Sequence, residues 1–347
     1  MQERKIKVLV IDDSVLYREI ISKGIIQDPM IEVAAVAEDS VSALRVVLEN
    51  PPDVITCDVE MPGMSGIDFV RRMLSGCFIP IIMVSSVSNT VFEAMEAGAV
   101  DFVVKPDISF SGGRTAFIQN LIKKIRIAST IRKKNPVQNT AGSTYTQTIS
   151  SSDGVIAIGA STGGMEAIRS ILNHIAPLFS SDTLPGILIA QHIPPFFSKM
   201  FADRLSSVTF LHVKEAETGD VVMPNQVLIC PGGHNMRLVK NGEAIQVECF
   251  SAEVADDSCP SVDILFHSVA EVSGQQAIGI LLSGMGFDGA QGLLAIRKNG
   301  GRTIGQSKES SVVYGMAKVA FEIGAVEQLA DLNDIPEILA KLLTETE

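Results

Sequence analysis

Three stretches of this sequence combine a possible nucleophile, base and carboxylate with turn-forming residues. The first is Gly159-Ala160-Ser161-Thr162-Gly163-Gly164, which follows an apolar run and precedes a segment with helical spacing of apolar residues. It fits the G-x-S-x-G turn that exposes a nucleophilic serine between a strand and a helix. A phosphate-binding turn of a nucleotide fold fits the same residues. So does a plain connection in which Ser161 caps the helix.

A nucleophilic serine needs a base and an orienting carboxylate, so the rest of the chain decides among these alternatives. His192 is the candidate base, because it ends the apolar run 186–191 and precedes Ile193-Pro194-Pro195. This places it at the carboxyl edge of a strand, as Ser161 is placed. The nucleotide alternative fits less well, since a dinucleotide site wants an acidic residue where this chain has Gln191 and His192.

Asp288 is the candidate carboxylate. It lies in Ser283-Gly284-Met285-Gly286-Phe287-Asp288-Gly289, a glycine-rich turn after the apolar run 277–282. It can orient an imidazole, or it can simply cap the helix expected at 290–298. The Met285 N–H and the helix start near Thr162 are candidate donors to an oxyanion. The chain order Ser161, His192, Asp288 differs from that of α/β-hydrolases.

A second group of polar residues lies in the first third of the chain, each at the end of a predicted strand. These residues are Asp12, Asp13, Asp58, Ser85 and Lys105. Clustered carboxylates repel one another unless a divalent cation lies between them, and Mg²⁺ prefers such oxygen ligands. The sequence therefore predicts Mg²⁺ at Asp13 and Asp58, with Asp12 beside them. Lys105 and Ser85 are placed to contact a phosphoryl group.

The elements that must position these residues alternate between strand and helix, which is typical of a doubly wound parallel sheet. For the first part of the chain, we expect strands at 7–11, 31–37, 53–57, 80–84 and 100–104 and helices at 17–26, 40–49, 67–74, 91–97 and 115–129. We expect a first domain at 1–128, a flexible linker at 129–152 and a second domain at 153–347. The predicted fold class is α/β, with a flavodoxin-like domain followed by a Rossmann-like domain.

Composition narrows the function classes. The net charge of −12 disfavours nucleic acid or an anionic membrane surface as the main partner. The five cysteines show no metal-binding spacing, and the charged N-terminus is not a signal peptide. We find no apolar run long enough to insert into a membrane. These observations favour reduced thiols and a cytoplasmic protein.

The first domain resembles the receiver domain of two-component response regulators. The likeness covers about residues 6–128 and rests on Asp12-Asp13, Asp58, Met61-Pro62-Gly63, Ser85 and Lys105-Pro106. It implies phosphorylation of Asp58 by a histidine kinase, with Mg²⁺ bound at the acidic residues. Phe102 stands where that family usually has an aromatic switch residue, and an ordinary core aromatic is the alternative.

The second domain resembles the catalytic domain of the chemotaxis protein-glutamate methylesterases. The residues that carry this likeness are the Ser161 turn, Gln191-His192-Ile193-Pro194, the Asp288 turn and Ser310-Ser311-Val312-Val313-Tyr314-Gly315-Met316. Ala317 departs from the proline that commonly follows in the family. The likeness implies hydrolysis of glutamate methyl esters on chemoreceptor cytoplasmic domains, deamidation of receptor glutamines, and no cofactor for the ester chemistry.

The same resemblance implies that the receiver blocks the esterase until Asp58 is phosphorylated. A binding module that has lost catalysis is the alternative, and labelling of Ser161 by a fluorophosphonate probe would distinguish the two. A DNA-binding output domain is disfavoured by the acidic balance and by the absence of a helix-turn-helix pattern.

Overall fold

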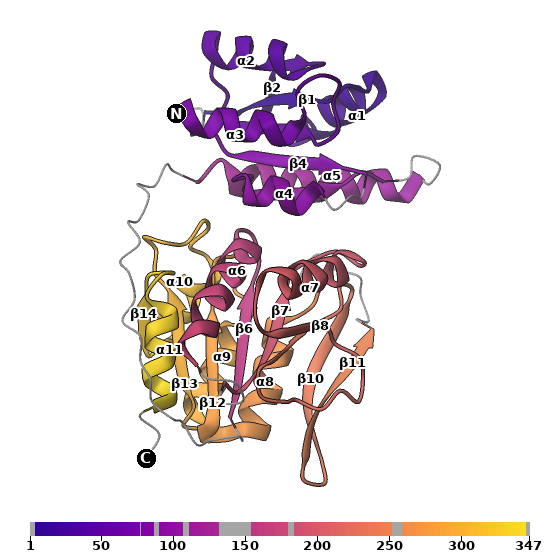
Figure 1. The fold of residues 1–347 in the computed structure, drawn as a ribbon. Helices are drawn as coiled ribbons and strands as arrows, with labels where there is room; N and C mark the ends of the chain where they lie inside the picture. The colour runs from indigo at the N-terminus through magenta and orange to yellow at the C-terminus, as the bar shows by residue number, and fades with distance from the viewer. Residues whose placement is uncertain are drawn as a thin grey trace. The chain divides into compact units, whose positions relative to one another are not determined.

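The computed structural model describes residues 4–76, 78–86, 90–106, 111–131, 154–179, 184–251 and 259–344. The chain divides into two compact units, Met1–Asn135 and Pro136–Glu347, each with its own parallel sheet (Figure 1). Most of the predicted linker 129–152 lies outside the described residues, so its flexibility stays a prediction. Among the described helices, none combines the length and the apolar character needed to cross a membrane.

The first unit is a five-stranded parallel sheet in the order β2-β1-β3-β4-β5. Its strands are β1 (Ile6–Ile11), β2 (Ile31–Ala37), β3 (Val54–Asp58), β4 (Ile81–Ser85) and β5 (Asp101–Val104). Its helices are α1 (Val15–Ile25), α2 (Ser40–Glu49), α3 (Gly66–Gly76), α4 (Thr90–Glu96) and α5 (Ser111–Ala128). Helix α1 packs against α5, and α3 packs against α4. The predicted alternation is confirmed.

Local chemistry explains these boundaries. Strands β3 and β4 are buried at every residue, and they are apolar apart from Thr56 and the residues that end them, Asp58 and Ser85. Ser14 and Asp39 cap α1 and α2 by accepting hydrogen bonds from backbone N–H groups of the first turn. The predicted ranges 31–37 and 40–49 match β2 and α2, whereas other ends differ by a few residues.

The second unit contains a seven-stranded parallel sheet in the order β14-β13-β12-β6-β7-β9-β8. Its strands are β6 (Val155–Ala160), β7 (Gly186–Gln191), β8 (His212–Glu215), β9 (Gln226–Ile229), β12 (Ala277–Leu281), β13 (Arg302–Gln306) and β14 (Gln328–Ala330). Its α-helices are α6 (Gly164–Ile175), α7 (Phe197–Val208), α8 (Val262–Ser273), α9 (Ala290–Lys298), α10 (Met316–Glu322) and α11 (Ile335–Thr344). Helices α8 and α9 pack together over the core formed with the sheet.

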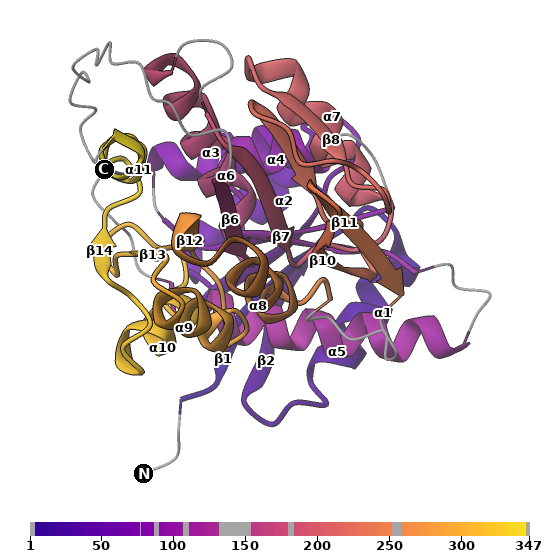
Figure 2. The same ribbon diagram turned by 90° about the horizontal axis from the view of Figure 1, so that it is seen from below.

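Several elements of the second unit were not predicted, and among them is an antiparallel hairpin that adds to the parallel sheet. Strands β10 (His234–Asn241) and β11 (Ala244–Ser251) form an antiparallel hairpin that packs against α8 (Figure 2). The sequence contains the cause, since the two-residue loop Gly242-Glu243 has a glycine at its first position, where a tight hairpin turn needs a positive φ, and Gly242 has a φ of 63°. The all-parallel prediction is therefore correct for the large sheet and incomplete for the unit.

Candidate functional site

The strand order brings the three predicted catalytic residues to one edge of the second sheet. Strand β6 pairs with β7 on one side and with β12 on the other. The chain leaves β6 for β7 and later returns to β12, so the connections diverge at β6. Such a switch point opens a crevice beyond the carboxyl ends of the strands. Ser161 follows β6, His192 follows β7, and Asp288 lies in the turn after β12.

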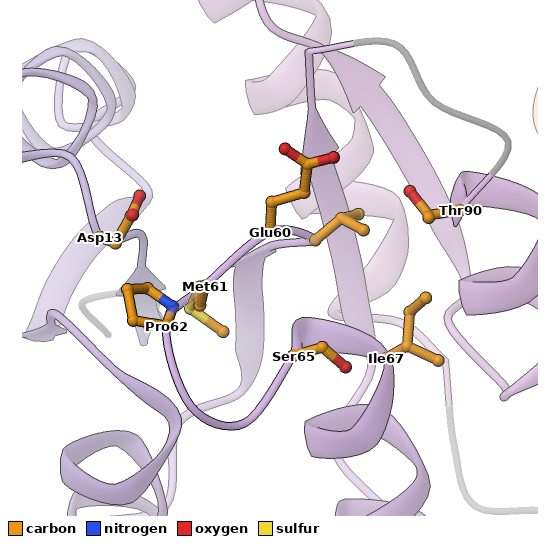
Figure 3. A pocket seen from close by; sticks show the side chains of 8 residues that line it. Asp13, Glu60, Met61, Pro62, Ser65, Ile67 and Thr90 are labelled. Carbon is orange, nitrogen blue, oxygen red and sulfur yellow. The ribbon is translucent and has the colours of Figure 1, made fainter.

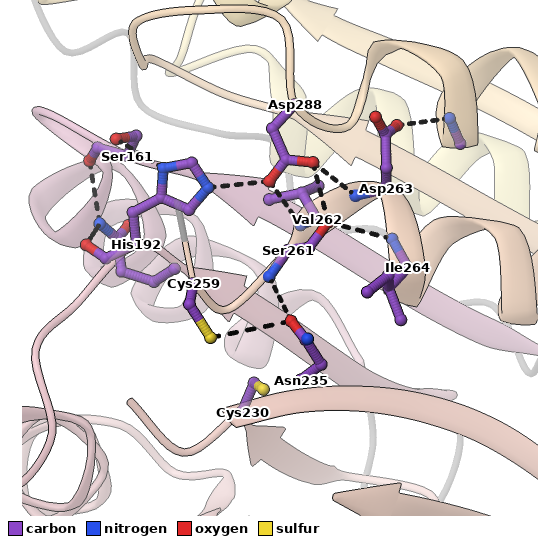
Figure 4. A network of polar contacts seen from close by, with 12 residues as sticks. Ser161, His192, Cys230, Asn235, Cys259, Ser261, Val262, Asp263, Ile264 and Asp288 are labelled. Carbon is purple, nitrogen blue, oxygen red and sulfur yellow. Dashed lines mark hydrogen bonds and ion pairs between the residues drawn. The ribbon is translucent and has the colours of Figure 1, made fainter. Parts of the chain in front are cut away.

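The imidazole of His192 lies between the other two side chains (Figure 4). Its Nδ1 is 3.1 Å from Ser161 Oγ, and its Nε2 is 2.9 Å from Asp288 Oδ2. Because a carboxylate only accepts hydrogen bonds, Nε2 carries the proton and the Nδ1 lone pair faces the serine hydroxyl. The ring nitrogens have the reverse assignment from the chymotrypsin-type triad, in which Nε2 faces the serine. His192 nevertheless has one ring nitrogen that can accept the Ser161 proton and another that is oriented by Asp288.

Asp288 does not cap the helix that follows it, so that alternative is wrong. The N-cap of α9 is Gly289, with a positive φ of 83°. Asp288 instead receives hydrogen bonds from the start of α8: Ser261 Oγ donates at 3.1 Å, Val262 N at 2.7 Å and Asp263 N at 2.9 Å. A helix N-terminus favours negative charge through its free N–H groups and its dipole. The Asp288 carboxylate is therefore held as an anion.

The pKa values of two neighbouring carboxylates at this helix start, Asp288 and Asp263, are shifted in opposite directions. Burial raises the pKa of Asp288, but hydrogen bonds from His192 and from the Asp263 and Val262 amides outweigh it, and the net pKa is lowered. Burial raises the pKa of Asp263, and the backbone bond from Gly292 only partly opposes it. Asp288 is thus the better anion of the two.

The Ser161 turn is fixed on its backbone as well as on its side chain. Ser161 N donates to the Ser283 carbonyl at 3.0 Å, and Gly164 N donates to the Ser161 carbonyl at 2.7 Å. The N-cap of α6 is Gly163, which has no side chain to offer, so Ser161 is not the helix cap. Of the three alternatives for this turn, the exposed nucleophile agrees best with this geometry.

The two candidate oxyanion donors lie beside Ser161. A Cβ on Gly284 would stand 2.7 Å from Ser161 Cβ, so the backbone that leads into Met285 runs directly against the serine. Within the described ranges, the Met285 N–H donates to no protein acceptor. The Thr162 side chain is buried, and the Thr162 carbonyl accepts from Ser283 Oγ at 2.8 Å. The oxyanion role of both residues stays a prediction.

The Ser310–Met316 stretch supports this loop. Val313 N donates to Ser283 Oγ at 2.9 Å, and the Val313 carbonyl accepts from Gly284 N at 3.1 Å. Met316 N in turn donates to the Gly284 carbonyl at 2.9 Å. The stretch thus holds the backbone on which Met285 is carried. Ala317, which replaces the usual proline, is buried at the start of α10 and does not touch these bonds.

Sequence reasoning missed the partners of Asp288. Ser261 precedes the apolar-periodic segment of α8 and caps it by accepting from Ile264 N at 3.4 Å. That serine therefore predicts a helix start. Nothing in the local pattern indicates that this start meets a carboxylate 27 residues later, since the contact comes from the packing of α8 against the loop after β12.

In the first unit, the strand ends bring together the predicted acidic residues. Carboxylate oxygens of Asp12, Asp13 and Asp58 lie within 4.8 Å of one another. Lys105 Nζ is 2.8 Å from Asp12 Oδ2 and 2.6 Å from Asp58 Oδ2. Three hard oxygen donors at this spacing, with Asp13 exposed to solvent, suit Mg²⁺.

Burial and the contacts of Lys105 act against each other on the pKa values of this cluster. Burial raises the pKa of Asp58, and the nearby Asp12 adds to it, so the pKa stays above its ordinary value although Lys105 opposes the shift. Burial lowers the pKa of Lys105, but its bonds to Asp12 and Asp58 outweigh that effect and raise it. The lysine is held as a cation and the acidic site is short of positive charge.

Other predicted residues of the first unit occupy the same edge. Ser85 is buried, and its carbonyl accepts from Lys105 N at 2.7 Å. Phe102 is buried at 4% exposure, which agrees with a core aromatic or with an inward-facing switch residue. Tyr17 was not predicted. Its ring centroid lies 4.5 Å from Lys105 Nζ and its hydroxyl donates to the Pro106 carbonyl at 2.9 Å, so it packs directly on the lysine.

A pocket opens beside the acidic cluster (Figure 3). Its volume is about 470 Å³, and its lining combines the carboxylates of Asp13 and Glu60 with apolar side chains and two hydroxyls. The remaining lining residues are Val59, Met61, Pro62, Ser65, Ile67 and Thr90. The pocket therefore opens to solvent at the edge where Asp13 lies.

Comparisons with known proteins cover both units. The model of the CheB methylesterase family matches residues 156–339, and that of the response regulator receiver domain matches residues 8–109. Protein-glutamate methylesterase/protein-glutamine glutaminase 2 of Syntrophomonas wolfei is 47% identical over 345 residues, which are 99% of this chain and 100% of the relative. The protein-glutamate methylesterase/protein-glutamine glutaminase of Escherichia coli O157:H7 is 40% identical over 344 residues, 97% of each chain. The crystal structure of the Thermotoga maritima CheB methylesterase catalytic domain is 34% identical, with a TM-score of 0.52, and covers 55% of this chain and 100% of that chain.

Proposed function

The chain belongs to the CheB methylesterase family and carries a response regulator receiver domain, and on this premise we propose that it hydrolyses glutamate methyl esters of chemoreceptors through Ser161, His192 and Asp288. It is a protein-glutamate methylesterase and protein-glutamine glutaminase. The observation that supports the mechanism best is the His192 ring, which bridges Ser161 Oγ at 3.1 Å and Asp288 Oδ2 at 2.9 Å.

The steps follow from that geometry. Ser161 Oγ attacks the ester carbonyl carbon while its proton passes to His192 Nδ1, and Asp288 stabilises the resulting imidazolium. The oxyanion meets backbone N–H groups, for which Met285 and the segment at Thr162 are the candidates. The tetrahedral intermediate expels methanol, protonated by His192, and leaves an acyl-enzyme. Water then attacks this acyl group with His192 as base and releases the glutamate carboxylate. With a glutamine substrate the same steps release ammonia.

Methanol release from a methylated receptor fragment tests this proposal. We expect Ser161→Ala to lower turnover by at least about 10⁴-fold, because the nucleophile is lost. Ser170→Ala, on the half-buried side of α6, is the matched serine control and should retain wild-type turnover. A fluorophosphonate probe should label the wild type at Ser161. Wild-type turnover in Ser161→Ala, or an unlabelled and inactive wild type, would contradict the mechanism, and the latter result would favour a binding module.

We further propose that a histidine kinase phosphorylates Asp58 and that this modification activates the esterase. Asp12, Asp13 and Asp58 would hold Mg²⁺, whose charge offsets that of the phosphoryl group. Lys105, already within 2.6 Å of Asp58, is the protein cation next to the added charge, and Ser85 lies on the adjoining strand end. The new charge would rearrange these contacts and bias a two-state equilibrium.

The regulatory proposal is tested on the full chain with a small phosphodonor and Mg²⁺. We expect the donor to raise methanol release in the wild type and to have no effect on Asp58→Asn. The matched control is Asp68→Asn, which removes an exposed carboxylate on α3 and should leave the response intact. An equal response in Asp58→Asn would contradict phosphorylation at this residue.

We place the reaction in the cytoplasm. Among the described residues, Cys57, Cys230 and Cys249 are free thiols, which is typical of a reducing compartment. The net charge of −12 agrees with partners that are proteins rather than nucleic acid.

A further inference from the structure

Gln191, the last residue of β7, is almost completely buried at 3% exposure and lies between the two catalytic turns. Its Nε2 donates to the carbonyl oxygen of Ser161 at 3.0 Å and to the carbonyl oxygen of His192 at 3.0 Å. Both N–H groups of one carboxamide are thus used on the backbones of the nucleophile and the base. Two acceptors on the same side also fix which end of the amide is nitrogen.

The sheet itself leaves these two turns weakly joined. Regular pairing between β6 and β7 ends at Ala160 and Gln191. Beyond that pair, one backbone bond continues the ladder, from His192 N to the Ala160 carbonyl at 3.0 Å. Pro194 and Pro195 follow closely and have no N–H to donate. The Gln191 side chain is therefore what ties the carbonyl of His192 to that of Ser161.

The amide is also held in place from its other side. A Cβ on Gly164 would lie 2.3 Å from Gln191 Oε1 and 2.5 Å from Ala160 Cβ. The carboxamide therefore packs against a helix start that has no side chain, and only glycine at position 164 leaves room for it. Gln191 Oε1 itself is buried without a hydrogen-bond partner among the described residues. The carboxamide of Gln191 is thus buried with hydrogen bonds to its nitrogen only.

We infer that Gln191 is a positioning residue for the esterase reaction, which sets the distance between Ser161 and His192 by clamping their two carbonyl groups. It touches neither substrate nor reacting atoms, and this role rests on the proposed serine mechanism. Displacements of about 1 Å in a catalytic arrangement cost on the order of 10²-fold in rate. We therefore expect loss of the clamp to lower kcat by about 10- to 100-fold and to leave KM unchanged.

The test compares full-length Gln191→Met with Thr303→Val. Methionine keeps the length and flexibility of glutamine but cannot donate. Thr303 is buried in β13 of the same sheet, where its Oγ1 donates to the Ala325 carbonyl at 2.8 Å, away from the Ser161 turn. Each variant thus loses a buried side-chain donor to a main-chain carbonyl. Thermal unfolding, kcat and KM for methanol release, and the rate of fluorophosphonate labelling of Ser161 are measured for both.

The clamp predicts that both variants unfold at lower temperature, whereas only Gln191→Met loses kcat and labelling rate in parallel. Equal kcat in the two variants would make Gln191 a purely structural residue and overturn the inference. A raised KM with unchanged kcat would also overturn it, because the residue would then act on substrate binding. Gln191→Glu, of equal size, is the second variant, and failure of both variants to fold would assign Gln191 to folding instead. An unlabelled wild type would contradict the serine mechanism rather than the clamp.

Discussion

Replacing Asp288 by asparagine tests how the structure orients His192, the proposed catalytic base. The carboxylate accepts four donors: His192 Nε2 and Val262 N reach Oδ2, while Ser261 Oγ and Asp263 N reach Oδ1. Asparagine offers only one acceptor oxygen. With that oxygen toward His192, the NH₂ group meets the Ser261 hydroxyl, which can rotate to accept, and the Asp263 N–H, which cannot. The histidine then keeps its tautomer but loses the charge of its partner.

The magnitude follows from that lost charge. Two unit charges about 4 Å apart attract by about 4 kcal/mol at an effective dielectric constant of about 20. Since about 1.4 kcal/mol corresponds to tenfold in rate, we expect kcat to fall by about 10³-fold. This is less than the roughly 10⁴-fold loss in a triad where the amide also imposes the wrong tautomer. One charge-assisted backbone bond is lost as well, which costs about 1–3 kcal/mol of unfolding free energy.

The stability loss also has a pH signature. The pKa of Asp288 is lowered from its ordinary value of 3.8 in the folded chain, so its contribution to stability is present above pH 3.8 and disappears as the pH falls through the folded value. The difference in unfolding free energy between wild type and Asp288→Asn should therefore be full at neutral pH and shrink in acid.

Steady-state methanol release and urea unfolding at pH 7 and below measure both effects. The matched control is Asp263→Asn at the same helix start. The pKa of Asp263 is raised by burial, and its side chain accepts from Gly292 N at 2.6 Å without contacting His192. This control should keep kcat close to wild type and lose little stability. If Asp288→Asn retained kcat within about tenfold of wild type, the charge argument would be refuted, because a loss near 4 kcal/mol is required.

Three further perturbations test other parts of the structure. In EDTA, Asp58→Asn should raise the unfolding free energy of the first unit by about 1 kcal/mol, because burial holds the pKa of Asp58 above its ordinary value and Lys105 keeps a second carboxylate partner. Calorimetry should show that Mg²⁺ raises the unfolding midpoint of the wild type only. A variant that is less stable than the wild type in EDTA would contradict this prediction. Gly164→Ala should lower kcat about tenfold and the free energy of unfolding by about 1–3 kcal/mol, because the new Cβ would stand 2.3 Å from Gln191 Oε1. Unchanged methanol release would contradict this, because it would show that the Gln191 side chain can move without affecting the reaction. Ser261→Ala should lower the free energy of urea unfolding by about 1 kcal/mol, because the helix cap is lost. It should also lower kcat about 3- to 10-fold, because Asp288 loses a hydrogen-bond donor. Unchanged values of both quantities would contradict the role given to this hydroxyl.

The sequence predicted the sheet edges because parallel strands buried on both faces are continuous apolar runs, and a polar residue that ends such a run marks the edge. Ser161, His192 and Asp58 could be placed in this way from the pattern alone. The electrostatic environment could not, because it depends on which distant element packs beside each strand end. The start of α8 meets Asp288 across 27 residues of sequence, and Tyr17 reaches Lys105 across 88.

The hairpin β10–β11 was missed for a different reason. Its turn, Gly242-Glu243, begins with a glycine and is a local signal, but the strands on either side are only partly buried and do not form continuous apolar runs. A search for the buried parallel strand passes over such segments, because an antiparallel pair with one solvated face alternates polar and apolar residues instead. The fold class could be predicted from the continuous apolar runs of the parallel strands, whereas the hairpin would have had to be predicted from the weaker alternating pattern of β10 and β11.

The two units place carboxylates at the same kind of sheet edge and give them opposite environments. Asp288 receives three donors from a helix start and one from His192, so its pKa is lowered and it serves as a permanent anion. Asp58 is buried beside Asp12 with a single lysine between them, so its pKa is raised. At the edge of Asp288 the hydrogen-bond donors already stabilise the carboxylate, so a cation would add little. At the edge of Asp58 positive charge is lacking, so a bound cation would stabilise the carboxylates. The proposed Mg²⁺ site in the first unit is therefore supported by the groups that face these strand ends, and not by the strand ends themselves.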